Sequence, residues 1–257
     1  MNNDNIKIKE LVTCDNFKKR TMKDLKNKVA YITGGTKGIG FAVAQTLLNQ
    51  GMRVAISGRS QKSVDLALKY FNNNAVLGIV SDVAKMADEK NAISKIMDKW
   101  GQVDVVLANA GVGNFAPIDQ MTDDEWHQMI DTNLNGVFHS LKASVEQLKK
   151  SKGYYITLAS LAGTNFFANG AGYNASKFGV VGFTQAAMLD LRQYDIKVST
   201  IMPGSVATHF NNHVPDESDA WKIQPEDIGQ LVVDLLKMNE RTLPSKIEVR
   251  PTRPDKK

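Results

Sequence analysis

A single doubly wound α/β domain is the fold that this sequence predicts. Short apolar runs alternate with amphipathic helical segments along the chain, a glycine-rich turn joins the first run to a helix, and no linker separates two cores. The chain has 257 residues, of which 42% are hydrophobic, a size that suits one α/β core. The alternation implies a mostly parallel, seven-stranded sheet with helices on both faces.

The individual elements follow from these runs and from helical periodicity. Strands are expected near residues 29–33, 53–57, 76–80, 103–108, 153–159, 196–202 and 246–250. Helices are expected near residues 38–50, 61–71, 86–100, 123–150, 173–194 and 225–239. Thr122 followed by acidic residues predicts the start of the fourth helix, and Pro225 that of the last.

Residues 25–257 therefore form one domain, and residues 1–24 are expected to be a flexible extension. The first 21 residues are polar and lack the apolar core of a signal peptide, and Met22 offers an alternative start of translation. Cys14 is the only cysteine, so no internal disulfide can form, which fits a reducing cytoplasm.

The glycine-rich turn after the first strand predicts a phosphate-binding site. Glycines let the backbone approach a pyrophosphate closely, and the free amides at the start of the next helix face the anion. The spacing is Gly-x-x-x-Gly-x-Gly, and an ordinary tight turn is the alternative interpretation. The expected cofactor contacts here are Gly34, Thr36, Lys37, Gly38, Ile39 and Gly40.

The residue after the second strand indicates which dinucleotide is bound. An acidic residue near this place suits the ribose of NAD, whereas an arginine suits the 2′-phosphate of NADP. The chain has Arg59 here and no acid, and Lys37 adds a second positive charge. We therefore expect NADPH/NADP+ as the cofactor, with two solvated surface cations as the alternative.

A tyrosine and a lysine four residues apart predict a proton donor. Tyr173 and Lys177 share one face of a helix, thirteen residues after Ser160. A phenol has a pKa of about 10, and a nearby positive charge lowers it. The pair would then protonate a carbonyl oxygen held by the Ser160 hydroxyl, although such a pair also occurs by chance on surface helices.

Together these motifs resemble the classical branch of the short-chain dehydrogenase/reductase family, including its 3-oxoacyl-[acyl-carrier-protein] reductase-like members. The resemblance spans about residues 25–250 and keeps the motifs in the family's order. It implies a Rossmann-like fold and a catalytic set of Asn133, Ser160, Tyr173 and Lys177. It also implies cofactor contacts from Asp82, Val83, Asn109, Ala110, Gly111, Pro203, Gly204, Val206 and Thr208, besides Tyr173 and Lys177.

The chemistry implied by the resemblance is NADPH-dependent reduction of a ketone or 3-oxoacyl carbonyl to a secondary alcohol. Tyr173 would be the acid, Lys177 would lower its pKa and bind the nicotinamide ribose, and the bent backbone at Asn133 would hold a water through its carbonyl. One alternative is a catalytically quiet NADP-binding sensor or scaffold. Another is a sugar-nucleotide epimerase or dehydratase of the extended branch, whose Gly-x-x-Gly-x-x-Gly turn is absent here.

The substrate is a small carbonyl compound, either free or bound to an acyl carrier protein. The segment Lys246–Pro251 departs from the Gly-Gly ending of the acyl-carrier subgroup. The pocket wall is expected from residues 161–171, 112–115 and the segment after Pro203. Four phenylalanines in these loops are either an apolar floor or plain packing residues: Phe115, Phe166, Phe167 and Phe210.

Several other functions are excluded or disfavoured by composition. The net charge of +5 is concentrated at the two ends, and no basic helix with interleaved aromatics indicates nucleic-acid binding. No apolar run is long enough to span a membrane. His209 and His213 lack a third ligand, so no metal is expected. A homodimer or homotetramer is expected, formed through residues 123–150 and 173–194.

Overall fold

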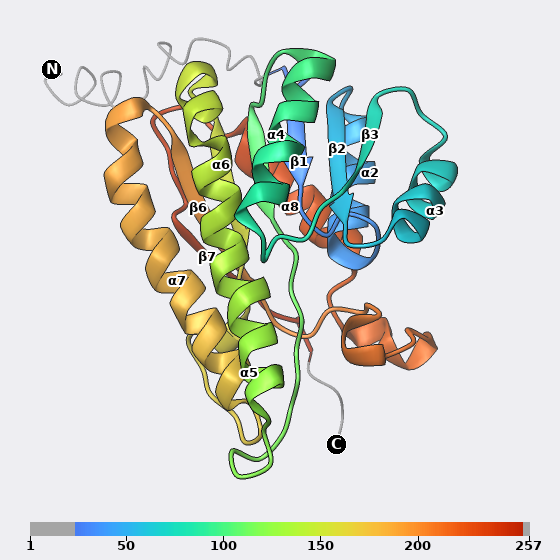
Figure 1. The fold of residues 1–257 in the computed structure, drawn as a ribbon, viewed down its shortest axis with the longest axis vertical. Helices are drawn as coiled ribbons and strands as arrows, with labels where there is room; N and C mark the ends of the chain where they lie inside the picture. The colour runs from blue at the N-terminus through green and yellow to red at the C-terminus, as the bar shows by residue number, and fades with distance from the viewer. Residues whose placement is uncertain (1–23, 254–257) are drawn as a thin grey trace, which may run out of the picture.

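Seven parallel strands form the centre of the protein, in the order β3-β2-β1-β4-β5-β6-β7 (Figure 1). This computed structural model describes residues 24–253, so the predicted extension and Cys14 lie outside the described part, apart from residue 24. The strands are β1 Val29–Ile32, β2 Arg53–Gly58, β3 Val76–Val80, β4 Val105–Ala108, β5 Tyr154–Leu158, β6 Lys197–Pro203 and β7 Lys246–Val249. All seven predicted strands are confirmed, with ends that differ by a residue or two.

Helices cover both faces of this sheet. They are α2 Gly38–Asn49, α3 Gln61–Phe71, α4 Met86–Trp100, α5 Asp123–Ile130, α6 Gly136–Ser151, α7 Ala171–Leu191 and α8 Pro225–Lys237. Short 3-10 helices lie at Leu161–Gly163, Arg192–Tyr194, Phe210–Asn212 and Glu217–Trp221. Helices α2, α3 and α8 pack on one face, and α4, α6 and α7 on the other.

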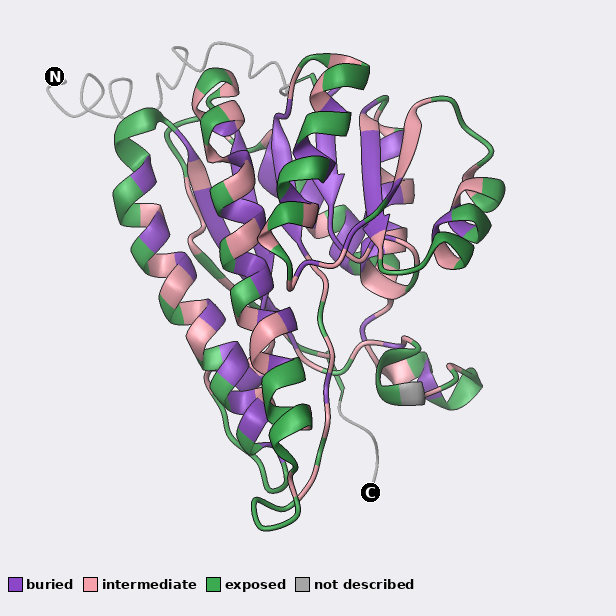
Figure 2. Cartoon of the chain, viewed as in Figure 1, coloured by how far each residue is buried: buried purple, intermediate pink, exposed green. Residues whose placement is uncertain are grey.

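Each strand contributes alternate side chains to the two cores. In β1, Ala30 and Ile32 face the α2–α8 side, whereas Val29 and Tyr31 face the α4–α6 side, and all four are fully buried. Figure 2 shows buried strands flanked by helices whose outer faces are exposed. This burial on both faces explains why the strands appear in the sequence as continuous apolar runs.

The predicted helix over residues 123–150 is wrong in one respect, because a π-helical turn, Asp131–Asn135, separates α5 from α6. A π turn adds one residue to the helix and hardly alters its hydrophobic pattern, so periodicity alone does not reveal it. The predicted start is confirmed: the Thr122 hydroxyl accepts a bond from the Glu125 amide, and the Glu125 carboxylate accepts one from the Thr122 amide.

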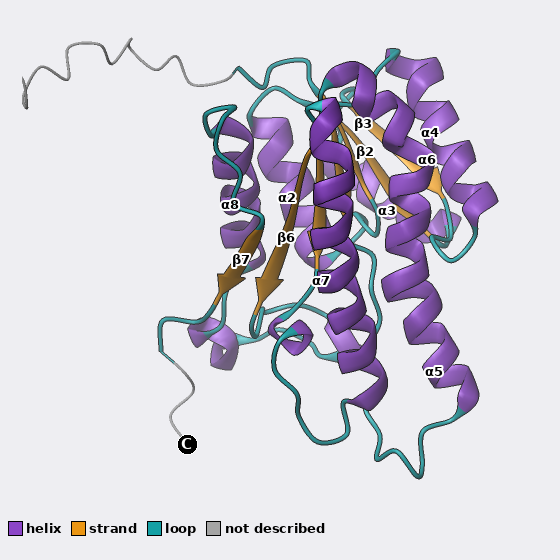
Figure 3. Ribbon diagram, turned by 90° about the vertical axis from the view of Figure 1, so that its left-hand side faces the viewer, coloured by secondary structure: helices purple, strands orange, loops and turns teal. Residues whose placement is uncertain are grey.

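The order of the strands places a crevice beside β1. The chain passes from β1 to β2 and β3, then returns to place β4 on the other side of β1. The loops that follow β1 and β4 therefore diverge at the carboxyl edge of the sheet, where ligands bind in folds of this kind. Figure 3 shows the loops after β6 and β7 leaving the sheet at their arrowheads.

The long helix α7 is buried along one side only in the single chain. Val180, Thr184 and Leu191 are buried against the sheet, whereas Phe178 and Leu189 are 41% and 52% exposed.

Within residues 24–253, no helix is long and apolar enough to cross a membrane.

Candidate active site

A cavity of about 1280 Å³ opens at the carboxyl edge of the sheet. Most residues that the sequence predicts for the site line it: Gly34, Thr36, Lys37, Gly38, Ile39, Arg59, Val83, Asn109, Ala110, Gly111, Ser160, Tyr173, Lys177, Pro203, Gly204, Val206 and Thr208. Gly40, Asp82 and Asn133 do not line it. The structure thus joins the predicted phosphate-binding turn with Ser160, Tyr173 and Lys177 of the predicted catalytic set in one cavity.

The glycine turn is shaped by close backbone approach. Gly34 and Gly38 have φ angles of +64° and +57°, a region that L side chains rarely adopt. A Cβ at Gly34 would lie 2.9 Å from Ala110 Cα, and one at Gly40 would lie 2.4 Å from Asn109 Nδ2. Glycine at these positions is therefore required by the turn and by its neighbour, the segment after β4.

Asn109 holds the glycine turn in place through hydrogen bonds to its backbone. Its Nδ2 donates to the carbonyl oxygens of Thr33 and Gly34, at 2.8 and 3.1 Å. The Thr33 hydroxyl accepts bonds from the Asn109 and Ala110 amides, both at 3.0 Å. These bonds tie the ends of β1 and β4 together, which gives the Asn-Ala-Gly segment a structural role beside the cavity.

The charges around the cavity favour an anion. Arg59 follows β2 directly, Lys37 lies within the glycine turn, and both are exposed. Among the described residues that line the cavity, none is aspartate or glutamate. A dinucleotide phosphate would therefore meet positive charge without a competing carboxylate.

Of the two predicted cofactor contacts Asp82 and Val83, only the second lines the cavity. Val83 lines it, whereas the Asp82 carboxylate accepts the Ala84 amide at 3.2 Å. Ser81, directly after β3, lines the cavity and was not predicted. The sequence signal that could have found Ser81 is its position at the carboxyl end of a parallel strand.

A buried carboxyl group supports Ser81 from behind. Glu89 of α4 accepts hydrogen bonds from Ser81 Oγ at 2.7 Å and from Tyr31 Oη at 2.9 Å, and Tyr31 Oη accepts one from Ser57 Oγ at 3.2 Å. Burial raises the pKa of Glu89 above its usual value, and these hydrogen bonds oppose the shift. Glu89 Oε2 is buried without a hydrogen-bond partner.

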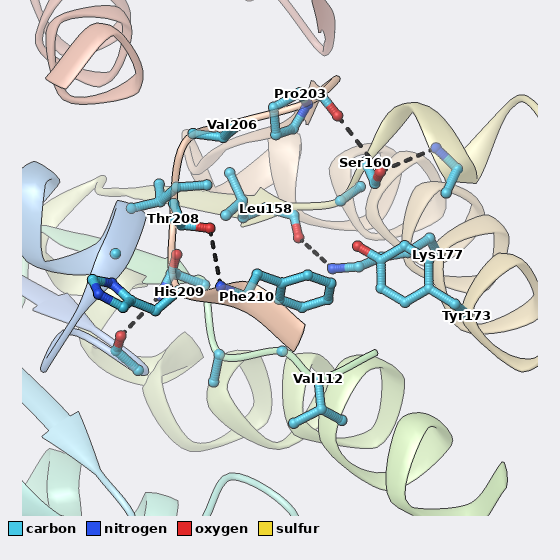
Figure 4. A pocket seen from close by; sticks show the side chains of 18 of the residues that line it. Val112, Leu158, Ser160, Tyr173, Lys177, Pro203, Val206, Thr208, His209 and Phe210 are labelled. Atoms are coloured by element: carbon cyan, nitrogen blue, oxygen red, sulfur yellow. Dashed lines mark hydrogen bonds between the residues drawn. The ribbon is translucent and has the colours of Figure 1, made fainter. Parts of the chain in front are cut away.

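The predicted catalytic side chains come from two elements that meet at the cavity (Figure 4). Tyr173 and Lys177 lie one turn apart on α7, and Lys177 Nζ is 5.7 Å from the centre of the Tyr173 ring. Lys177 Nζ donates to the Leu158 carbonyl at 2.9 Å. Ser160, after β5, accepts the Ala162 amide at 3.1 Å and donates to the Pro203 carbonyl at 3.5 Å.

The pKa of Tyr173 departs from the sequence prediction. Burial raises it to about 12, and a hydrogen bond with Ser160 only partly opposes this. Burial lowers the pKa of Lys177 to about 8. The expected lowering of this pKa by Lys177 is not found in the protein alone, where burial disfavours the ionised phenolate and Ser160 is the group that opposes the shift. At neutral pH Tyr173 carries its proton.

Asn133 lies behind the cavity wall in the π turn and is 1% exposed. Its Oδ1 accepts the Val112 amide at 2.8 Å, and its Nδ2 donates to the Val112 carbonyl at 2.9 Å and to Ser176 Oγ at 3.0 Å. Its side chain is thus committed to structure. The expected bend in the backbone is present at this position, and the water-binding role of its carbonyl stays a prediction.

The segment after β6 closes another side of the cavity. His209, His213, Trp221 and Lys222 line it, and Arg250 and Pro251 join them from the end of β7. The sequence predicts that the segment after Pro203 forms part of the pocket wall, and pairing of Val206 with Ile223 brings this segment back to the cavity. His213 pairs with Asp219, and residues 24–253 contain no group of three or more His, Cys, Asp or Glu side chains that could hold a metal.

A doubly wound parallel sheet with a glycine turn and a Ser-Tyr-Lys set in one crevice defines a dinucleotide-binding oxidoreductase. The short chain dehydrogenase family model matches residues 28–219, and the chain belongs to this family. The predicted family is thereby confirmed.

Characterised and uncharacterised relatives agree with this assignment. An uncharacterised oxidoreductase of Staphylococcus saprophyticus is 30% identical, covering 90% of this chain and all of that protein. The 3-oxoacyl-[acyl-carrier-protein] reductase of Escherichia coli is also 30% identical, covering 81% of this chain and 85% of that protein. The structure of a Thermococcus sibiricus alcohol dehydrogenase complexed with 5-hydroxy-NADP has a TM-score of 0.83 at 28% identity, covering 90% of this chain and all of that one.

Proposed function

We propose that this protein is an NADPH-dependent reductase that converts a ketone or 3-oxoacyl carbonyl to a secondary alcohol, with Tyr173 as the acid. The observation that carries the proposal is the meeting, in one cavity, of the glycine turn with the Ser160, Tyr173 and Lys177 side chains. The relatives named 3-oxoacyl-[acyl-carrier-protein] reductase support a 3-oxoacyl thioester as one candidate substrate.

The residues around the turn fit NADPH. At Gly34 and Gly40 the glycine turn has no room for side chains, which leaves its backbone open to a pyrophosphate. Arg59 and Lys37 line the same cavity, and their positive charges support binding of a 2′-phosphate. One similar structure contains an NADP derivative and another, from Brucella melitensis, contains NADH, so the family alone does not decide between the two cofactors. The two cations of this chain and the lack of an acid on its described cavity wall support NADPH.

The chain's own groups position the carbonyl and move the proton. Bound NADPH would supply the hydride. Ser160 hydrogen-bonds the carbonyl oxygen and stabilises the charge that develops there. Tyr173 then donates its proton to that oxygen, and the Lys177 ammonium, 5.7 Å from the ring centre, stabilises the phenolate that remains.

The pKa of Tyr173 favours the reductive direction. Since burial raises it to about 12, the resting group is a protonated acid at neutral pH. Oxidation of an alcohol would require the phenolate, which is scarce under the same conditions. We propose that a water bound by the Asn133 carbonyl returns the proton by way of Lys177.

The test is NADPH consumption with a panel of diketones, 3-oxo esters, sugars, steroids and a 3-oxoacyl thioester. We expect NADPH to be oxidised much faster than NADH. Tyr173→Phe should abolish turnover and leave NADPH affinity nearly unchanged, because it removes the acid and keeps the ring. Tyr194→Phe, far from the cavity, is the control and should keep full activity. Turnover that survives Tyr173→Phe would contradict the assigned acid.

The same experiment separates a quiet NADP-binding sensor or scaffold from an enzyme. Such a protein would bind NADPH and show no turnover with any member of the panel. The site argues against it, since all side chains needed for proton transfer are present and placed together.

We also propose self-association through α6 and α7. Phe138 of α6 and Phe178 of α7 are 46% and 41% exposed. The rings of Phe138 and Phe183, which lies on α7, have a centroid distance of 6.3 Å, so an apolar surface spans both helices. Light scattering should show a homodimer or homotetramer, and Phe138→Lys should dissociate it. Leu66→Lys, at an exposed position of α3, should not. A monomeric wild-type protein would overturn this proposal.

A further inference from the structure

Three phenylalanine rings meet around the ring of Tyr173. Phe115 contacts Tyr173 edge-on at a centroid distance of 5.5 Å, and Phe210 contacts it at 5.8 Å. Phe167 reaches the group through Phe115, at 5.7 Å. The rings come from three different loops, which follow β4, β5 and β6, and Figure 4 shows the Phe210 ring beside Tyr173 and Lys177. We call Phe115, Phe167 and Phe210 the aromatic cluster.

Two glycines make room for the aromatic cluster. A Cβ at Gly113 would lie 2.6 Å from Phe210 Cζ and 3.1 Å from Phe115 Cζ. A Cβ at Gly170 would lie 2.5 Å from Phe167 Cε2. A side chain at either position would push a ring away from its neighbours, so the loops are shaped to hold the rings together.

The exposure of the aromatic cluster distinguishes a binding surface from plain packing. Phe167 and Phe210 line the cavity and are 48% and 38% exposed, and Phe115, which contacts both rings, is 41% exposed. Rings that serve only to fill a core are buried. An apolar surface kept open inside a cavity is instead available to a ligand.

Two cations of the cavity wall, one from the segment after β6 and one from the end of β7, already form ion pairs. Lys222 forms an ion pair with Asp219, and Arg250 forms one with Glu248 at 2.9 Å. A carboxylate on the substrate would lose its hydration beside the phenyl rings and would have to compete for these cations. Lys177, the cation beside Tyr173, is buried and already donates to the Leu158 carbonyl at 2.9 Å, so the phenyl rings favour an uncharged group at this place.

We propose that the aromatic cluster is the specificity pocket of the enzyme and selects uncharged ketones that carry an aromatic ring, or an apolar group of similar size, next to the carbonyl. The inference rests on the proposed function, because Tyr173 fixes where the carbonyl oxygen lies. Edge-to-face contact with the cluster would then hold the ring of the substrate while its oxygen faces Tyr173 and Ser160.

The test compares three ketones on the whole protein with NADPH. Acetophenone carries the ring, butanone lacks it, and 4-acetylbenzoate adds a carboxylate. We expect kcat/KM for acetophenone to exceed that for each of the other two by about tenfold or more, the scale set by burial of one ring. Phe167→Leu and Phe210→Leu should each lower kcat/KM for acetophenone more than kcat/KM for butanone, mainly through KM, so that most of this preference is lost.

Matched variants separate the ring from the loop. Phe167→Tyr keeps the ring and should retain the preference for acetophenone. Ile118 is 71% exposed and does not line the cavity, so Ile118→Ala should not change kcat/KM for any of the three ketones. Unfolding midpoints of all variants show whether each one is folded under the assay conditions.

The outcomes distinguish this inference from the proposed function. If the wild-type protein reduces no ketone of any class, the proposed function fails. If it reduces ketones but favours butanone or 4-acetylbenzoate, or if Phe167→Leu and Phe210→Leu keep the preference for acetophenone, the aromatic cluster is not the specificity pocket, while the proposed function stands.

Discussion

Replacement of Lys177 by methionine is expected to stabilise the protein while it abolishes turnover. The ammonium is buried beside Tyr173, and burial lowers its pKa from 10.5 to about 8. A depression of this size corresponds to a cost of about 3 kcal/mol in the folded state at neutral pH. Methionine keeps much of the apolar stem of lysine and removes the buried charge.

The loss of one hydrogen bond reduces the expected gain in stability of Lys177→Met. Lys177 Nζ donates to the Leu158 carbonyl at 2.9 Å, and Leu158 is buried, so methionine leaves that acceptor without this donor. An acceptor left unpaired costs about 1–2 kcal/mol. The net expectation is a gain of about 1–2 kcal/mol, which raises the melting temperature by about 2–4 °C for each kcal/mol in a chain of this size.

The pH dependence provides the sharper test. Below pH 8 the lysine is charged in both the folded and the unfolded chain, so the wild type carries the full cost. Between pH 8 and 10.5 the folded chain loses its proton first, the unfolded chain binds more protons, and wild-type stability rises. The advantage of Lys177→Met should therefore be greatest at neutral pH, decrease above pH 8, and reverse before the pH reaches 10.5, because the missing hydrogen bond then outweighs the remaining cost of the buried charge.

Urea unfolding of the wild type and of Lys177→Met between neutral pH and pH 10.5 measures the difference between their free energies of unfolding. Groups that titrate equally in both proteins cancel in this difference. Lys95→Met, at an exposed position of α4, is the control and should show no such pH dependence. The reasoning is refuted if Lys177→Met is less stable than the wild type at neutral pH, or if the difference between them is the same at every pH.

Three further changes test other parts of the site. Arg59→Asp should narrow or reverse the preference for NADPH over NADH, measured as the ratio of kcat/KM values, and an unchanged ratio would exclude Arg59 from 2′-phosphate binding. Glu89→Leu should cost about 2–3 kcal/mol in urea unfolding, because Tyr31 and Ser81 lose their acceptor, and Glu89→Gln should cost less. The raised pKa of Glu89 means that the folded chain holds its proton more tightly than the unfolded chain, so wild-type stability relative to Glu89→Gln should fall as the pH rises through this pKa. Gly40→Ala should cost about 1–3 kcal/mol and weaken NADPH binding in titrations, since its Cβ would lie 2.4 Å from Asn109 Nδ2, and wild-type affinity in this variant would show that the turn tolerates a side chain.

Local signals in the sequence were sufficient to predict the strands and most of the site. Strands such as β1 and β4 are buried on both faces, so each is a continuous apolar run. The motifs around Gly34 and Tyr173 combine local geometry with chemistry. The break in the helix at Asp131–Asn135 was not visible, because a π turn barely shifts the periodicity.

Quantities that depend on the whole fold were the ones missed. The direction of the Tyr173 pKa shift follows from burial, which a Tyr-x-x-x-Lys spacing does not report. Trp221 and Lys222 reach the cavity only because the chain doubles back at Ile223. The phenylalanines were recognised as either pocket or packing, and only their exposure and mutual contacts distinguish the two.

The amide of Asn133 links parts of the chain that are distant in sequence. Both hydrogens of its nitrogen are used, one by the Val112 carbonyl and one by Ser176 of α7, while its oxygen accepts the Val112 amide. A shift of the loop after β4 on ligand binding must therefore carry the π turn and α7 with it or break one of these bonds. Because α6 and α7 also present Phe138 and Phe178 outward, we expect ligand occupancy and subunit assembly to influence each other's equilibria.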